Sequence, residues 1–258
     1  MLDAHPQSVA TARVTSQTLG MQQLCPHGLS EQWLLGACGD IHWTLLAKSL
    51  EQDGLRFKAA DGRPLYAAFC ATRLELAPSR SLLGENMSIH SDIAATSGPK
   101  TGSRHVFRHQ GRVVGSLLML STFVAHDETG SNRRIVRALP SGSYTLPAAG
   151  PDLMALDRRA RHTSRGLRGQ YMPLDDADRI DPCYSLDFNA VGLLYFPSFS
   201  RFAESVVRCP KPLRMREVVY LGNLDAGEAL YVQRSGAETH IAGADGRIIA
   251  QVNEERAS

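Results

Sequence analysis

The sequence predicts an α+β fold in which a helix packed against an antiparallel sheet occurs twice in one chain. Residues 105–115 (HVFRHQGRVVG) and 240–250 (HIAGADGRIIA) both place a His six residues before a Gly-Arg pair, and each segment is typical of strand, glycine turn and strand. Upstream of each, a Gly-Leu pair at 28–29 and at 192–193 opens an apolar, aromatic-rich stretch typical of a helix. Two copies in the same order indicate a duplicated domain. Binding sites commonly form where two such halves meet, so we expect the chemistry there.

The composition narrows the class of protein. The 258 residues suffice for one large domain or two small ones, and 43% apolar with 21% charged residues is typical of a globular chain. The net charge of +2 is too small to indicate nucleic-acid binding, and no apolar run approaches the roughly 18 residues of a membrane span. The N-terminus does not resemble a secretory signal, and the five cysteines lack zinc-type spacing. We therefore expect a cytoplasmic protein without a metal site, a membrane segment or a nucleic-acid partner.

The first domain is predicted to span residues 1–140 and to contain one main helix. Ser30 is a suitable N-cap for this helix, whose apolar face follows directly. Gly39 is expected to interrupt the helix, and Asp40 to cap a continuation as far as Leu50.

The sheet of the first domain is predicted from runs of β-forming residues. Residues 9–14 are expected to join a first strand, and strands are predicted over 65–76 and 86–93. A hairpin over 104–126 follows. Its second strand is nearly continuous in apolar residues, so both of its faces should be covered.

The second domain is predicted to span residues 183–258, after a linker over 141–182 that is rich in turn residues and carries one helix near 152–161. A strand is expected over 184–192, and then a helix with Pro197 in its first turn. Three further strands are predicted around 218–221, around 229–234 and in the hairpin of the repeat.

A motif before this second helix resembles a known class of proteins. Residues 186–204 (LDFNAVGLLYFPSFSRFAE) are similar to the segment that leads into the central helix of hot-dog acyl-thioester enzymes, which show an Asp, an Asn or Asp, a Gly and then aromatic residues. The matching positions here are Asp187, Asn189, Gly192, Tyr195 and Phe196. A helix wrapped by an antiparallel sheet, twice in one chain, corresponds to a double hot-dog architecture.

The first half resembles a narrower group, the LnmK family of bifunctional acyltransferase/decarboxylases. The segments that carry this resemblance are 28–43 (GLSEQWLLGACGDIHW), 61–69 (DGRPLYAAF) and 118–134, which holds LMLSTFV and GSNRR. The resemblance implies an enzyme of polyketide biosynthesis that decarboxylates methylmalonyl-CoA and transfers the propionyl group to an acyl carrier protein. It implies no cofactor beyond the CoA thioester itself and the phosphopantetheine of the carrier. That family carries the acyl group on a tyrosine, and Tyr66 is the matching position.

Elementary chemistry shows what such a reaction needs. A phenol with a pKa of roughly 10 must be activated before it attacks a thioester, and its ester then passes the acyl group readily to a thiol. Loss of CO₂ places negative charge on the thioester oxygen, which requires hydrogen-bond donors. The backbone N–H groups of Gly28 and Leu29, at the start of the predicted helix, are candidates for this role. The structural alternatives are that Tyr66 is a core residue and Gly28 a turn residue.

Four further polar residues are candidates for the site. His27 and His42 could orient a substrate carboxylate or activate Tyr66, although a His beside a Trp on a helix is often simply packed or exposed. Ser121 and Thr122 interrupt a very apolar strand, so their hydroxyls either face the site or bond locally to the backbone.

Arginines supply candidate contacts to phosphate. Asn132 and Arg133, in GSNRR, could bind the phosphates of CoA, with a solvated turn as the alternative. A second patch places five arginines in eleven residues and could attract CoA or an acidic carrier protein, with a solvated helix face as the alternative. It consists of Arg158, Arg159, Arg161, Arg165 and Arg168.

Two other functions compete with acyl transfer. If Asp187 reaches the cleft it could act as nucleophile or general base, which would make the chain an acyl-CoA or acyl-carrier-protein thioesterase. A non-catalytic acyl-binding partner would keep the pocket and form no acyl-enzyme. Assembly through the sheets would give a homodimer.

Overall fold

The computed structural model describes residues 11–52, 54–77, 82–142, 145–207 and 211–257. Its helices are α1 (Glu31–Ser49), α2 (Pro151–Leu167), α3 (Tyr184–Asp187) and α4 (Phe196–Ser205), with a 3-10 turn at Met21–Gln23. Its strands in the first half are β1 (Ala12–Thr18), β2 (Leu24–Cys25), β3 (Gly28–Leu29), β4 (Phe57–Lys58), β5 (Pro64–Leu76), β6 (Asn86–Ala95), β7 (Lys100–His109), β8 (Arg112–His126) and β9 (Ile135–Arg137). The remaining strands are β10 (Asp178–Ile180), β11 (Leu213–Tyr220), β12 (Leu230–Ser235), β13 (Glu238–Gly243) and β14 (Ile248–Arg256).

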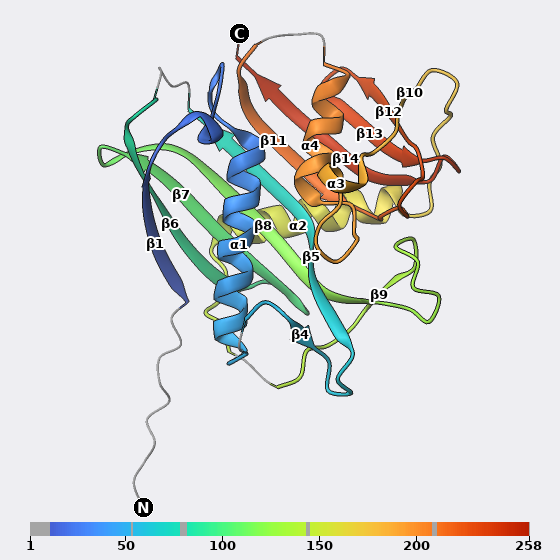
Figure 1. Cartoon of the computed structure of the whole chain (residues 1–258), viewed down its shortest axis with the longest axis horizontal. Helices are drawn as coiled ribbons and strands as arrows, with labels where there is room; N and C mark the ends of the chain where they lie inside the picture. Colours follow the sequence, from blue (N-terminus) through green and yellow to red (C-terminus); the bar gives the residue numbers. More distant parts are fainter. Residues whose placement is uncertain (1–10, 53, 78–81, 143–144, 208–210, 258) are drawn as a thin grey trace, which may run out of the picture.

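The predicted duplication is confirmed by the order of the strands. One sheet runs β1-β6-β7-β8-β5-β11-β14-β13-β12-β10, with all of these neighbours antiparallel (Figure 1). Counted outward from the β5–β11 seam, β8-β7-β6-β1 on one side corresponds to β14-β13-β12-β10 on the other. The two hairpins recognised in the sequence, β7–β8 and β13–β14, therefore occupy equivalent places. α1 lies against the first half of the sheet and α4 against the second.

α1 is one continuous helix of nineteen residues, so the predicted interruption at Gly39 is wrong. Ser30 caps the helix as predicted, with its hydroxyl accepting from the Trp33 N–H at 3.3 Å. Gly39 serves packing instead, because a Cβ there would lie only 3.0 Å from the Phe196 ring. The absence of a side chain thus lets α1 approach α4 closely.

Both faces of the central strands are covered, as the continuous apolar run in β8 predicted. Leu117, Met119 and Phe123 face the core beneath α1. The alternate residues Leu118 and Leu120 pack on the opposite face against α2.

The segment predicted as a linker carries α2, which is longer than the helix expected over 152–161. Pro151 lies in its first turn, and the Leu153, Leu156 and Ala160 side chains are buried. They pack across β5, β7, β8 and β11, so α2 touches strands of both halves. The domain limits at 140 and 183 stay a prediction.

The strand predicted over 184–192 is wrong, while the following elements are confirmed. Residues 184–187 form the short helix α3, and the chain then loops to α4, whose first turn holds Pro197 as expected. The loop is shaped by its own polar groups, because backbone N–H groups of Cys183 and Leu193 bond to side chains of Asp187 and Asn189. The strands predicted around 218–221 and 229–234 are β11 and β12, and the predicted hairpin is β13–β14.

Within the described residues, no helix has both the length and the apolar character needed to cross a membrane. The same part of the chain holds no group of three or more His, Cys, Asp or Glu side chains that could bind a metal ion.

Candidate active site

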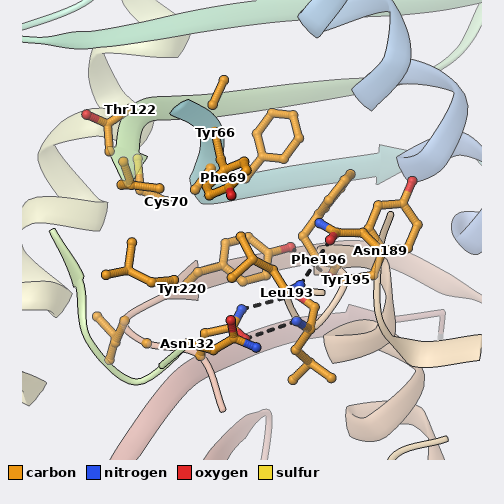
Figure 2. A pocket seen from close by; sticks show the side chains of 18 of the residues that line it. Tyr66, Phe69, Cys70, Thr122, Asn132, Asn189, Leu193, Tyr195, Phe196 and Tyr220 are labelled. Atoms are coloured by element: carbon orange, nitrogen blue, oxygen red, sulfur yellow. Dashed lines mark hydrogen bonds between the residues drawn. The ribbon is translucent and has the colours of Figure 1, made fainter. Parts of the chain in front are cut away.

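A cleft of about 1750 Å³ opens where the two halves separate. β5 pairs with β11 only between Ala71 and Glu75, and towards Pro64 its neighbours are β8 and the short strand β4. The loop before α4 and the residues after β11 form the opposite wall (Figure 2). The cleft is larger than the usual 300–1,000 Å³ of a small-molecule pocket, so it has room for a long ligand.

Three aromatic rings in mutual contact line the cleft. The Phe69 ring centroid lies 4.4 Å from that of Phe196 and 5.5 Å from that of Trp43. The Trp43 indole donates to the Ala67 carbonyl at 2.9 Å, which fixes its ring in place. The rings therefore form a rigid apolar surface suited to an acyl chain.

Asp40, on α1, is the only carboxylate among the described residues that line the cleft. No hydrogen bond or ion pair joins this carboxylate to another described side chain, and burial raises its pKa above the ordinary value. Tyr195 faces the same helix, with its hydroxyl 3.5 Å from where a Cβ on Gly36 would lie. Burial and the nearby Asp40 raise the Tyr195 pKa to about 12, so its hydroxyl stays protonated. Asp40 is thus available as a base.

Asn189 presents an oriented amide to the cleft. Its side-chain oxygen accepts from the backbone N–H groups of Val191 and Leu193, both at 3.1 Å. These two bonds distinguish the oxygen from the nitrogen and hold the amide in one orientation. Its NH₂ group has no partner within the described structure, so it can donate to a ligand (Figure 2).

Tyr66 and Thr122 also line the cleft, on neighbouring strands β5 and β8 (Figure 2). The Tyr66 ring packs edge-on against His126, with centroids 5.4 Å apart. The His126 ring is held in turn by the Asn132 side chain at 2.8 Å. No described residue is hydrogen-bonded to the Tyr66 hydroxyl. The structure therefore agrees with the placement of these two predicted residues beside a cavity, and their chemical roles stay predictions.

Two solved structures with a similar fold are thioesterases by name. No family model and no curated protein matches the chain. An acyl-ACP thioesterase from Bacteroides thetaiotaomicron superposes with a TM-score of 0.67 at 12% identity, covering 95% of this chain and 97% of that one. A 12:0-ACP thioesterase from Umbellularia californica gives a TM-score of 0.62 at 10% identity, covering 99% of each. The chain is a double hot-dog. At this identity the likeness establishes the fold, and it does not show the narrower LnmK family.

In this double hot-dog, His42 lies outside the cleft and inside the core. Its two ring nitrogens each lie 2.7 Å from a hydroxyl, Nδ1 from Ser103 and Nε2 from Ser121. The chain of bonds continues through His105 to Ser91. Burial lowers the His42 pKa to about 3, so the ring is neutral. His42 and Ser121 are therefore hydrogen-bonded to one another in the core, and neither side chain reaches Tyr66.

Ser121 and Thr122 were both candidates for the site, with local hydrogen bonding as the alternative, and the pleat of β8 separates them. Successive side chains of a strand point to opposite faces. Ser121 points to the buried core beneath α1, and only Thr122 lines the cleft.

His27, Gly28 and Leu29 also lie away from the cleft. His27 is exposed at the tip of the β2–β3 ribbon, and Leu29 is buried in the first core. The structure does not bring Gly28 and Leu29 to Tyr66. The equivalent pair of the second copy, Gly192 and Leu193, borders the cleft through Leu193. The repeat was the sequence signal for this position, because it offered the Gly-Leu pair of the second copy as an alternative to Gly28 and Leu29.

Asn132 and Arg133 line the cleft but are used in contacts between the halves. The Asn132 amide donates to the Gly192 carbonyl at 2.7 Å and to the Leu224 carbonyl at 3.0 Å. Arg133 forms ion pairs with Asp245 at 2.7 Å and with Glu228 at 3.3 Å. Both side chains therefore connect the two halves, and their contacts to phosphate stay a prediction.

Asp187 is buried and fully engaged. Its carboxylate accepts from Arg201 at 2.6 and 3.0 Å and from the Cys183 N–H at 2.8 Å. It does not line the cleft, so its position favours a structural role in shaping the loop before α4. The sequence interpretation assigned Asp40 to a helix cap and Asp187 to possible chemistry; the structure places Asp40 inside a continuous helix at the cleft and Asp187 away from it.

Proposed function

We propose that this double hot-dog hydrolyses acyl thioesters carried on a phosphopantetheine arm, with the acyl chain held against the aromatic rings of the cleft. The observation that carries the proposal is one unpaired carboxylate, Asp40, in the same apolar cleft as the oriented donor Asn189. The two structural neighbours described above, both thioesterases by name, support it.

The reaction needs a base, an oxyanion donor and a leaving thiol. The Asp40 carboxylate takes a proton from water, and the water oxygen bonds to the thioester carbon. Negative charge moves to the carbonyl oxygen, where the Asn189 NH₂ group donates to it. The C–S bond then breaks, the sulfur receives the proton from Asp40, and a free carboxylic acid remains. The pKa of Asp40 is raised, so it lies closer to neutral pH than that of an ordinary carboxyl group, which favours general base catalysis.

Replacing Asp40 with Asn tests the proposal. We expect kcat for release of free thiol from a series of acyl-CoA substrates to fall by about 10²-fold or more. Asp92→Asn is a matched control, because burial also raises the Asp92 pKa but this residue lies on β6 outside the cleft. Normal hydrolysis by Asp40→Asn, or an equal loss in the control, would contradict the assignment.

A second candidate function is acyl transfer through Tyr66, favoured by the unbonded Tyr66 hydroxyl in the same cleft. In this reaction the phenol oxygen takes the acyl group from the CoA sulfur, and a carrier thiol then displaces it. Decarboxylation of methylmalonyl-CoA would need its enolate oxygen to be held by Asn189, since Gly28 and Leu29 lie elsewhere.

Intact-protein mass spectrometry after mixing with methylmalonyl-CoA separates the two functions. A covalent acyl adduct that is absent in Tyr66→Phe supports acyl transfer. Free acid and CoA without an adduct support hydrolysis. Binding of the acyl-CoA with neither product would favour a non-catalytic acyl-binding protein.

A further inference from the structure

We propose that the mouth of the cleft binds the phosphate at the end of the pantetheine arm on four arginines, Arg137, Arg165, Arg168 and Arg247. This inference rests on the proposed function, because it assumes that the substrate is carried on such an arm. The pantetheine arm ends in a phosphate both in CoA and on a carrier protein, so either molecule could supply this ligand.

The four side chains come from three separate elements and line one cleft. Arg165 and Arg168 lie at the end of α2, Arg137 ends β9, and Arg247 lies in the β13–β14 turn. The chain after α2 runs directly beside this turn, since the Met172 N–H donates to the Gly246 carbonyl at 2.9 Å and the Ile248 N–H to the Gln170 carbonyl at 3.1 Å. The fold therefore holds the end of α2 and Arg247 side by side.

These arginines differ from their neighbours in having no anionic partner. Arg133 is paired with Asp245, Arg159 with Glu217 and Arg161 with Asp157. Within the described part of the chain, the guanidinium groups of these four arginines have no ion pair and no hydrogen bond; the Arg247 backbone N–H donates to the Asp245 carboxylate at 3.2 Å. Unpaired guanidinium groups lining one cleft attract an anion, and each planar group can donate two parallel hydrogen bonds to phosphate oxygens.

Charged side chains reach the cleft from both faces of the sheet. Asp40 and Trp43 lie on α1, whereas Arg165 and Arg168 lie at the end of α2, which packs on the opposite face. Arg56 also lines the cleft. A phosphate at the arginines would place the arm across the seam, with its thioester towards Asn189 and its acyl chain towards Phe69. The opposite orientation would bring the phosphate to the carboxylate of Asp40, which repels it.

Isothermal titration calorimetry with pantetheine and 4′-phosphopantetheine measures the phosphate contribution without turnover. We expect the phosphorylated arm to bind at least about tenfold more tightly to the unmodified protein, because it adds charge-assisted hydrogen bonds to the arginines. In the double variant Arg165→Gln/Arg168→Gln this difference should largely disappear, while pantetheine binds as before.

Arg158→Gln/Arg214→Gln is the matched control, because it removes the same charge from two exposed arginines outside this cleft. We expect this control to bind phosphopantetheine like the unmodified protein. Equal binding of the two arms by the unmodified protein, or an equal loss in the control, would overturn the proposal.

Three further measurements identify the source of the phosphate and separate this inference from the proposed function. A similar loss for CoA, phosphopantetheine and a holo-carrier protein supports a site for the phosphate of the arm. A loss confined to CoA would assign the arginines to its adenosine phosphates and overturn the proposal. Hydrolysis of an acyl-N-acetylcysteamine thioester, which has no phosphate, reports on Asp40 alone, so failure of catalysis is distinguished from failure of the phosphate site.

Discussion

Replacing Arg216 with Met should destabilise the fold strongly, because this side chain connects both halves. Arg216 lies on β11 and is 1% exposed. Its guanidinium reaches Glu31 on α1 at 2.5 Å, Glu204 on α4 at 2.5 Å and Glu254 on β14 at 2.6 Å. Burial keeps the Glu31 pKa above its ordinary value even with the arginine beside it. Methionine would leave Glu31 without its cation, while Arg256 still pairs with Glu204 and Glu254.

The expected loss follows from burial. Glu254 keeps Arg234 and Arg256 as partners, whereas Glu31 has no other ion pair among the described residues. Removing one partner of a buried pair costs about 3–5 kcal/mol, since the other charge stays desolvated. For a chain of this size each kcal/mol lowers Tm by roughly 2–4 °C, so we expect a decrease of about 6–20 °C.

Urea unfolding at pH 7 measures this loss, with Arg179→Met as the control. Arg179 and Asp181 form an exposed pair, with 59% and 69% of their side chains accessible, and removing it should cost less than about 1 kcal/mol. Adding Glu31→Gln to Arg216→Met should recover part of the stability, because it removes the unpaired buried charge. A loss below about 1 kcal/mol for Arg216→Met, or no recovery in the double variant, would refute the reasoning.

Three further predictions concern packing, pH and catalysis. Gly115→Ala should destabilise the protein by more than about 1 kcal/mol, because the new Cβ would lie 2.7 Å from the Glu75 carbonyl oxygen. Gly166→Ala should stabilise the protein by about 0.5–1 kcal/mol, because Gly166 is a helical position with open space around it. Thermal unfolding that ranks the two variants in the reverse order would contradict this prediction. Burial lowers the pKa values of His42 and His105 to about 3, so below pH 6.5 the unfolded chain binds more protons than the folded protein. The stability of the fold should therefore fall as pH decreases from 6.5 towards 3. NMR signals of either imidazole that titrate between pH 8 and 5 would show this to be wrong. Asn189→Asp keeps the oxygen that accepts from the Leu193 N–H but removes the NH₂ donor. We therefore expect kcat for hydrolysis to fall by about 10²–10³-fold without loss of the fold. Unchanged turnover would exclude Asn189 as the oxyanion donor.

The duplicated fold could be predicted because its signals are local. The glycine turns of the two hairpins, the Ser30 cap and the apolar run of β8 each depend on a few neighbouring residues, and each is confirmed. The position of Tyr66 on a strand was predictable for the same reason. Local signals failed where one residue has two possible uses. Gly39 could end a helix or admit a neighbouring ring, and only the approach of α4 decides between them.

The candidate site depended on contacts between segments far apart in the chain. The sequence alone determined that two copies exist and which polar residues they contain. The tertiary structure decided that β5 of the first copy meets the loop before α4 of the second, so that Leu193 and Asn189, rather than Gly28 and Leu29, border the cleft. It also decided the surroundings of the two aspartates, because Arg201 lies against Asp187 whereas no described cation pairs with Asp40. The reason is physical: the chemistry of a carboxylate depends on its burial and on nearby charges, and folding brings these from distant parts of the sequence.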